Sequence, residues 1–339
     1  MQNALSVIIP VGTGRLQNLQ NALYALQLQT LPKDKFEVII VADGSEDETL
    51  GVAHAYPELD VRYIWTPKFQ PRQDTPPRNK GARLAKYPFL VFLDSDVLLH
   101  AKALEYYMED VTHNPLGVVA GRYDWLPPCV IGKRELEKGL ESIYSYNAER
   151  DDLDVHVRVL PFPKGNPTHN VCRDMRQPMF FETTPETVYM GDGHLNVYLG
   201  AFSGCLLIAA DTFWKAGGYW EEMTAGIVDD GSFGLTLWVK SVIRDSKNRP
   251  ILDENGKIQN DPVFSMRLDK RVYGCHQYHD RNLAFVQATT AREVDLINRR
   301  FGLEQYKEEG RMPVLPKPLF ELSQDAQKAW GVDKWRKDF

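Results

Sequence analysis

Cysteine is scarce in this 339-residue chain, and its four cysteines (Cys129, Cys172, Cys205 and Cys275) lack the close spacings of zinc sites and redox pairs. This scarcity argues against a disulfide framework and favours reduced, buried thiols in a cytoplasmic protein. The sequence also lacks an apolar run of the roughly 18–20 residues that span a bilayer, and it lacks the basic, then apolar start of a signal peptide. We therefore expect no membrane span, and any contact with a membrane to be peripheral.

An excess of basic residues is also missing, because 40 Lys and Arg stand against 46 Asp and Glu, for a net charge of -6. General binding to nucleic acid needs a net basic surface, so this function class is excluded. With 43% hydrophobic and 25% charged residues, the composition is that of a folded protein and not of a disordered chain. The length predicts roughly two structural units, or one large α/β domain with an extension.

Short apolar runs typical of buried strands alternate with helical patterns over the first hundred residues. The predicted strands are residues 5–9, 36–41, 61–65 and 89–93. Pro10 should end the first strand, because proline cannot donate a hydrogen bond to a sheet. One helix is predicted from four leucines at helical spacing, namely Leu16, Leu19, Leu23 and Leu26. This alternation predicts a mostly parallel central sheet with helices on both faces and a ligand site at the carboxyl ends of the strands.

The second half of the chain is less regular. Residues 151–200 are rich in Pro, Gly, Asn and Thr, and we expect a long, partly ordered excursion there. We predict strands over residues 202–209 and 270–274 and a helix over residues 230–241. The polar residues 245–261 contain turn signals and predict a surface hairpin or a flexible insert.

The sharpest local signal is Asp94-Ser95-Asp96, which directly follows the predicted strand at residues 89–93. Mg2+ and Mn2+ prefer oxygen ligands and often bind through one or two carboxylates together with substrate phosphates. The two carboxylates therefore predict a divalent-cation site at the end of this strand. The alternative is a turn in which an aspartate caps the next helix.

Two more candidate residues are expected at the same edge of the sheet. Asp43 ends the second predicted strand, where its carboxylate can accept a base N–H of a nucleotide or can cap the helix that Ser45 and Glu48 predict. Arg78 is followed by Asn79 and lies upstream of the fourth strand. A guanidinium can hold a phosphate through two hydrogen bonds, although a solvated helix start is the alternative.

Two further clusters have open interpretations. His276 and His279 follow the predicted strand at 270–274 and could be metal ligands, or else one structural and one surface histidine. Trp220 lies beside Glu221. Its ring could stack on the sugar of an acceptor, or it could be a core aromatic.

Five blocks of the sequence resemble glycosyltransferase family 2 in their order and spacing. The blocks are Ser6-Val7-Ile8-Ile9-Pro10, residues 41–47, Arg78-Asn79-Lys80-Gly81, residues 92–96, and residues 217–231 with a glycine pair and the acidic pair Asp229-Asp230. The resemblance covers roughly residues 4–240. It implies the A-type glycosyltransferase fold, with a Rossmann-like nucleotide-binding half and an acceptor half. It also implies sugar transfer from a nucleotide donor with Mn2+ or Mg2+.

The resemblance carries functional roles onto matching positions. The implied nucleotide-binding residues are Pro10, Val11, Asp43, Arg78, Asp94 and Ser95. The implied metal ligands are Asp96 and Asp94 of the DxD motif, with the late histidines His276 and His279. Asp230 is implied as the general base, with Asp229 beside it, and Trp220 and Glu221 are the candidate acceptor-binding residues.

Two blocks depart from the family pattern. The acidic doublet expected after the second strand is Ala42-Asp43, which leaves base recognition open between a UDP-sugar, the favoured donor, and GDP-mannose. The expected Glu-Asp pair is Asp229-Asp230, which leaves open which aspartate accepts the proton.

The resemblance, together with these residues, thus implies a cytoplasmic, metal-dependent and inverting glycosyltransferase. Its acceptor would be a glycan, as in polysaccharide biosynthesis, or a small hydroxylated molecule. The alternatives are a sugar nucleotidyltransferase and a non-catalytic sugar- or nucleotide-binding module on the same scaffold. We predict a nucleotide-sugar-binding half over residues 1–110, an acceptor half over 111–245 and a C-terminal extension over 246–339.

Overall fold

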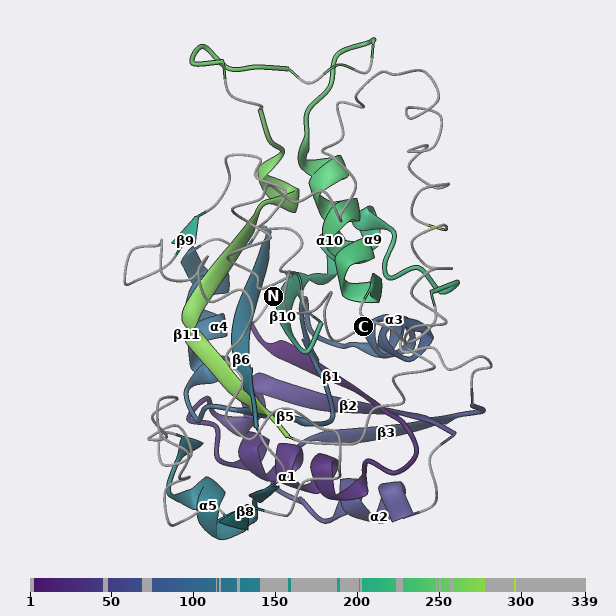
Figure 1. Cartoon of the computed structure of the whole chain (residues 1–339), viewed down its shortest axis with the longest axis vertical. Helices are drawn as coiled ribbons and strands as arrows, with labels where there is room; N and C mark the ends of the chain where they lie inside the picture. Colours follow the sequence, from purple (N-terminus) through teal and green to yellow (C-terminus); the bar gives the residue numbers. More distant parts are fainter. Residues whose placement is uncertain are drawn as a thin grey trace.

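A mixed β-sheet forms the centre of the protein in the computed structural model (Figure 1). Within the described residues it has nine strands in the order β3-β2-β1-β4-β10-β6-β11-β5, with β9 paired to β11. The structure describes residues 3–44, 48–68, 75–113, 115, 117–126, 129–140, 158–159, 188–189, 201, 203–223, 228–247, 249, 251–256, 259–277 and 296.

The first four strands form a parallel unit, as the apolar runs predict. They are β1 (Leu5–Val11), β2 (Phe36–Asp43), β3 (Val61–Thr66) and β4 (Phe89–Leu93). β1 pairs in parallel with both β2 and β4, and β2 pairs in parallel with β3. Since all four run in the same direction, their carboxyl ends lie along one edge of the sheet.

Pro10 does not end β1, contrary to the prediction from the sequence. The strand continues to Val11, and Pro10 lies opposite Val41 of β2. The pairing of β1 with β4 covers only Leu5 to Ile8, so the proline lies where β1 has lost one of its two neighbours. At such a position the missing amide hydrogen is tolerated.

Helices cover both faces of the sheet, as expected from a parallel arrangement. One face carries α1 (Leu16–Gln27), α2 (Glu48–His54) and α4 (Ala103–His113). The opposite face carries α3 (Thr75–Leu84), α9 (Ala210–Ala216) and α10 (Val228–Ser241). The four leucines that predict α1 lie on it, and three of them are completely buried, namely Leu19, Leu23 and Leu26.

Side chains that alternate along each strand form the two hydrophobic cores, one on each face of the sheet. Val91 and Leu93 of β4 join the core with α1, α2 and α4, whereas Leu90 and Phe92 join the core with α3, α9 and α10. Successive side chains of a strand point to opposite faces, so a continuous apolar run is required when both faces are covered. This explains why the sequence of β4 is uniformly apolar.

The later strands extend the sheet beyond β4. β10 (Cys205–Ala209) is antiparallel to β4 and to β6 (Val118–Trp125). β11 (Met266–His276) then lies between β6 and the short β5 (Val97–Leu99), which brings the end of β11 beside the strand that follows Asp96. The remaining elements are η1 (Lys33–Lys35), β7 (Cys129–Val130), α5 (Lys133–Glu137), β8 (Arg158–Val159), β9 (Val188–Tyr189) and η2 (Pro262–Phe264).

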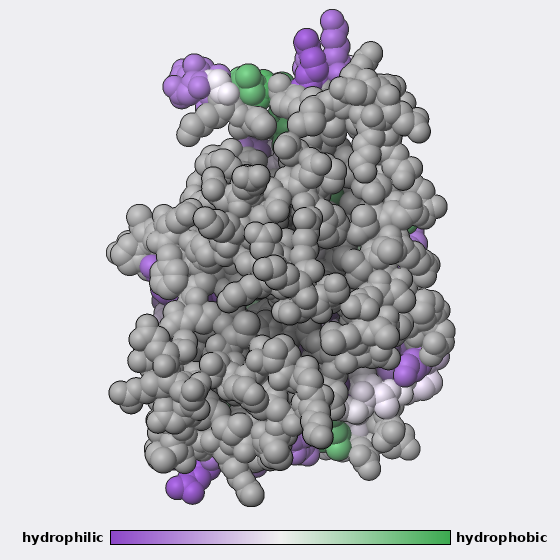
Figure 2. Space-filling model, viewed as in Figure 1, coloured by the Kyte–Doolittle hydropathy of each residue, from purple (hydrophilic) through white to green (hydrophobic). Residues whose placement is uncertain are grey.

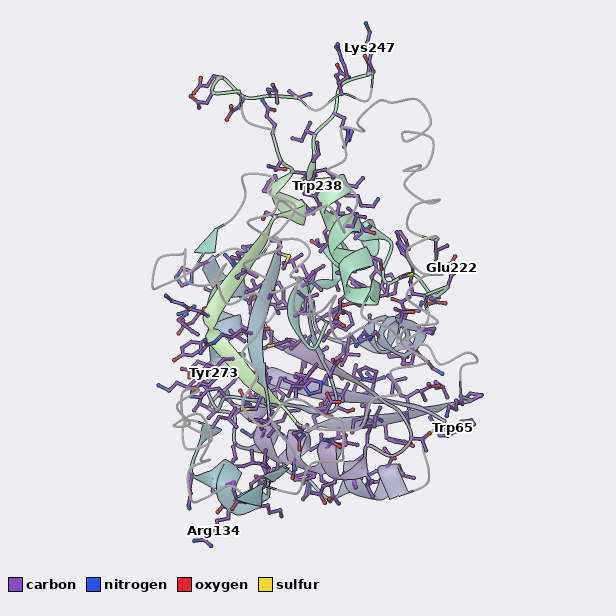
Figure 3. The ribbon with its side chains drawn as sticks, viewed as in Figure 1. Trp65, Arg134, Glu222, Trp238, Lys247 and Tyr273 are labelled. Carbon is purple, nitrogen blue, oxygen red and sulfur yellow. The ribbon has the colours of Figure 1, made fainter. Side chains whose placement is uncertain are left out.

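The polar segment before β11 forms the predicted surface hairpin. Backbone hydrogen bonds join Ile243 to Gln259 and to Ile251, and a turn around Lys247 marks one tip (Figure 3). The segment projects beyond α10 and β11 at the top of Figure 1. Figure 2 shows apolar atoms between the two hydrophilic tips. Leu252, which belongs to this segment, is 54% exposed.

Several predictions concern residues outside the described part. Most of residues 151–200 and the capping residue Ser45 fall there. Cys205 and Cys275 are buried free thiols, as expected. Among the described helices, none is long and apolar enough to cross a membrane. The boundaries of the two halves and of the extension remain predictions.

Candidate active site

The carboxyl edge of the parallel strands gathers most of the predicted site residues. β1 ends at Val11, β2 ends at Asp43, and β4 is followed directly by Asp94, Ser95 and Asp96. Val11, Asp43, Ser95 and Asp96 are buried, and Asp94 is partly exposed. Three separate stretches of sequence therefore meet at one edge because their strands are parallel neighbours.

Arg78 of α3 is ion-paired with the first carboxylate of the DxD motif. Its Nη2 donates to Asp94 Oδ1 at 2.7 Å, and its guanidinium lies 5.8 Å from the centre of the Tyr219 ring. Burial raises the pKa of Asp94 to about 6, against the opposing effect of Arg78, and the charges of Asp96 and Asp230 raise it further. A buried arginine thus balances part of the negative charge at this edge.

His276 faces the second carboxylate of the motif. Its Nε2 lies 3.4 Å from Asp96 Oδ1, and its backbone pairs with Val97 of β5. Its Nδ1 lies 2.9 Å from the carbonyl oxygen of Gln277, which can only accept a hydrogen bond. This contact assigns the hydrogen to Nδ1, so in a neutral ring the Nε2 lone pair faces a carboxylate.

Asp230 lies in the first turn of α10, and its carboxylate is held by Ser203. Asp230 Oδ1 accepts hydrogen bonds from the Ser203 amide at 3.0 Å and from the Ser203 hydroxyl. The negative charge of Asp230 contributes to the raised pKa of Asp94, so the two carboxylates lie close enough to interact. The first turn of a helix, where Asp230 lies, also presents unpaired backbone N–H groups.

The glycine pair before Tyr219 forms a turn that α3 binds. Gly217 and Gly218 have φ values of 101° and 69°, which a residue with a side chain adopts only at a cost. Asn79 of α3 accepts from the Tyr219 amide at 3.0 Å and donates to the Tyr219 carbonyl at 2.8 Å and to Glu221 at 2.9 Å. The turn is therefore fixed against the helix that also carries Arg78.

The two acceptor-binding candidates have different environments. Trp220 is buried in the core between α3, α9 and α10, and its carbonyl accepts a hydrogen bond from Thr75 at 2.9 Å. Trp220 is therefore a core aromatic, which was one of the two interpretations that the sequence allowed. Glu221 is exposed and accepts from Asn79 and from Arg83, and Glu222 beside it projects outward (Figure 3). A role for either residue in acceptor binding stays a prediction.

The donor set at Asp96 fits a divalent cation with few protein ligands. Two ligands bound side by side to one ion at about 2.1 Å lie about 3 Å apart, which is close to the spacing of Asp96 and His276. Among the described residues no group of three or more His, Cys, Asp or Glu side chains is arranged to hold a metal. His279 and the side chain of Asp229 lie outside the described part, so their predicted roles stay open.

Sequence reasoning missed three residues that organise the site, namely Ser203, Asn21 and Gln277. Ser203 holds Asp230, and Gln277 contacts both Asp96 and His276. Each acts across a sequence separation that local spacing does not reveal. A buried asparagine on the apolar face of α1 was a signal that Asn21 has a buried partner.

The strand order, the helices on both faces and the carboxylates at the strand ends define the A-type glycosyltransferase fold. Residues 6–161 match the family profile described as "Glycosyl transferase family 2". This match covers a little under half of the chain, and it confirms that these residues resemble glycosyltransferase family 2.

Curated relatives agree with this placement. The chain is 28% identical over 239 residues to validoxylamine A glucosyltransferase of Streptomyces hygroscopicus subsp. jinggangensis, covering 69% of this chain and 51% of the relative. It is 34% identical over 121 residues to the poly(ribitol-phosphate) beta-N-acetylglucosaminyltransferase TarP of Staphylococcus aureus, covering 35% of this chain and 36% of the relative. The chain thus spans about half the length of the first relative, and its match to the second covers 36% of that relative.

The fold is also that of a solved glycosyltransferase structure. S. aureus TarS 1-349 in complex with UDP-GlcNAc has a TM-score of 0.51 and 17% sequence identity, covering 82% of this chain and 60% of that chain. The same TarS fragment in complex with UDP has a TM-score of 0.51 and 16% identity, covering 96% and 78%. At this level of identity the likeness extends to the fold alone.

Proposed function

We propose that the protein transfers a sugar from a UDP-sugar to a hydroxyl group of an acceptor, with inversion at the anomeric carbon. The observation that carries the proposal is the meeting of Asp94, Asp96, His276 and Asp230 around the ends of β4 and β11. TarS, which shares the fold, has been solved with UDP-GlcNAc, and this supports the choice of uridine nucleotide as the first donor to test.

Asp96 and His276 would hold Mn2+ or Mg2+. Their spacing fits two adjacent ligands, and the Nδ1 contact to Gln277 turns the Nε2 lone pair toward Asp96. When bound, the cation supplies positive charge that stabilises the diphosphate leaving group. Arg78 already engages Asp94, so we assign Asp96 as the motif's cation ligand and Asp94 to orientation and ribose contact.

Asp230 would act as the general base. The acceptor oxygen attacks the anomeric carbon, the bond from that carbon to the phosphate oxygen breaks, and its electron pair leaves with the nucleoside diphosphate. The acceptor proton passes to Asp230, whose Oδ1 is oriented by Ser203 and whose Oδ2 we assign as the proton acceptor. A single displacement of this kind inverts the configuration.

The acceptor would be a polyhydroxylated molecule, either a glycan or a small metabolite. The names of two relatives support this range, because one acts on validoxylamine A and the other on poly(ribitol-phosphate). A cytoplasmic location, a role in polysaccharide biosynthesis, peripheral contact with a membrane and a GDP-sugar donor stay predictions without further support.

The first experiment measures nucleoside diphosphate release from UDP-, GDP- and dTDP-sugars, with Mn2+ and with EDTA. We expect release from one donor, inhibited by EDTA. Asp96→Asn should abolish the metal-dependent release and weaken Mn2+ binding. Asp230→Asn should lower the transfer rate about 10²–10⁴-fold and leave UDP binding intact.

Asp60→Asn is the matched control, because Asp60 is an exposed carboxylate just before β3, at the opposite edge of the parallel strands. It should keep the activity of the natural chain. No release from any donor, together with no Mn2+-dependent nucleotide binding, would overturn the proposal and favour a non-catalytic binding module. Full transfer by Asp230→Asn would reject Asp230 as the base.

A further inference from the structure

Gln277 makes four hydrogen bonds at the point where β11 ends, and two of them reach the proposed cation ligands. Its amide donates to the Asp96 carbonyl at 2.7 Å, and its own carbonyl accepts from His276 Nδ1 at 2.9 Å. Its side chain accepts from Asn21 at 2.7 Å and donates to the Asn18 carbonyl at 3.0 Å. The main chain of Gln277 thus holds Asp96 and His276, while its side chain is attached to α1.

Asn21 is the buried partner on α1. Its Nδ2 donates to Gln277 Oε1 and, at 3.0 Å, to the Ile131 carbonyl, and its Oδ1 accepts from Gln17 at 3.2 Å. These three bonds use both amide hydrogens and the carbonyl oxygen. Burying an amide on an apolar helix face costs free energy unless its polar atoms are hydrogen-bonded. The hydrogen bond to Gln277 therefore offsets part of the cost of burying Asn21.

Helix α1 is a firm anchor for this connection. Leu19, Leu23 and Leu26 are completely buried against the sheet, and α1 packs directly against β5, the strand that follows Asp96. The bond between Asn21 and Gln277 therefore joins the end of β11 to a helix whose position relative to Asp96 is set by the core.

We propose that Asn21 and Gln277 are positioning residues that hold His276 at ligand spacing from Asp96 by bonding the end of β11 to α1. This inference rests on the proposed cation site and names residues that act through its ligands. Outer groups that orient metal ligands typically change metal affinity 10–100-fold when they are removed.

The chain offers a matched control in Gln29, which lies just beyond the other end of α1. Gln29 is also buried, donates to the Ala25 and His100 carbonyls at 3.2 and 2.9 Å, and accepts from the Leu104 amide at 3.0 Å. Gln29→Leu removes a buried, fully bonded glutamine of the same kind without touching Asp96 or His276. It separates a loss of general stability from a loss of ligand position.

The experiment compares Gln277→Leu, Asn21→Leu and Gln29→Leu in the full chain. Mn2+ binding is measured by calorimetry with the nucleotide selected by the donor panel. We expect the dissociation constant for Mn2+ to rise 10–100-fold in Gln277→Leu and Asn21→Leu and to change less than 3-fold in Gln29→Leu. Urea unfolding checks that the three variants lose comparable stability.

A second measurement needs no metal. Hydrogen exchange of the Gln277 amide, which is bonded to the Asp96 carbonyl, should accelerate in Asn21→Leu and stay slow in Gln29→Leu. If Gln277→Leu fails to fold, Gln277→Glu serves in its place. It keeps an acceptor for Asn21 and loses the donor to Asn18, so an intermediate weakening of Mn2+ binding is expected.

The failure of this inference can be told apart from the failure of the cation site. If Asp96→Asn weakens Mn2+ binding while Gln277→Leu and Gln29→Leu behave alike, the positioning role is wrong and the cation site stands. If Asp96→Asn binds Mn2+ like the natural chain, the cation site itself is wrong, and the positioning role falls with it.

Discussion

A partly buried ionic cluster between α4 and β11 should make the stability of the protein depend on pH. Asp110 of α4 and Asp269 of β11 are both almost completely buried. Arg271 binds both oxygens of Asp269, at 2.7–3.1 Å, and Glu109 at 2.8 Å. Arg267 lies 3.4 Å from Asp110 Oδ1. Three carboxyl groups thus share two guanidinium groups, and one proton on Asp110 would balance the cluster.

The sign of the effect follows from the pKa of Asp110. Burial and the charge of Asp269 raise this pKa from the ordinary 3.8 to about 7, although Arg267 opposes the rise. Between these two values the folded protein keeps a proton that the unfolded chain has lost. The stabilisation is therefore complete below the unfolded pKa and is lost as the pH rises to about 7.

The magnitude follows from the same two values. The rise in the pKa of Asp110 from 3.8 to about 7 corresponds to about 4 kcal/mol of unfolding free energy over the whole pH range, at about 1.4 kcal/mol per pH unit within it. Asp110→Asn keeps the shape and stays neutral, so it removes this contribution. The difference in unfolding free energy between the natural chain and Asp110→Asn should fall by about 2 kcal/mol from pH 5 to pH 6.5.

Urea unfolding followed by tryptophan fluorescence at pH 5, 6.5 and 8 measures this difference. Asp60→Asn, at an exposed carboxylate, is the control and should track the natural chain at every pH. A difference that stays constant from pH 5 to pH 6.5 would show that Asp110 is ionised in the folded protein and that burial does not raise its pKa.

Three further changes test the packing around the site, each by urea unfolding. Phe213→Ala should lower the unfolding free energy by about 3–5 kcal/mol, because this buried ring packs against Phe92 with 5.1 Å between the ring centres. A loss below about 1 kcal/mol would contradict its place in the core. Gly217→Ala should cost about 1 kcal/mol because of its φ of 101°, whereas a gain in stability would contradict the left-handed turn. Asn79→Asp should cost about 2 kcal/mol, since it places a carboxylate against Glu221, and Asn79→Ala tells the lost bonds from the added charge.

Much of the fold was predictable because its signals are local. The four uniformly apolar runs predict β1 to β4, since strands buried on both faces need side chains of one kind. Leucines at helical spacing predict α1, because a helix that packs on a sheet needs one apolar face. The end of β1 was predicted wrongly, because whether Pro10 is tolerated depends on how far β4 extends beside it, and local sequence does not contain that register.

The sequence by itself determined that carboxylates stand at the ends of parallel strands, because strand ends and DxD spacing are properties of neighbouring residues. Only the tertiary structure decided their partners. Arg78 engages Asp94 and His276 faces Asp96, and Trp220 joins the core. The bond from Asn21 to Gln277 spans 256 positions. Such contacts follow from strand order and helix packing, because these bring side chains that are far apart in the sequence next to one another in space.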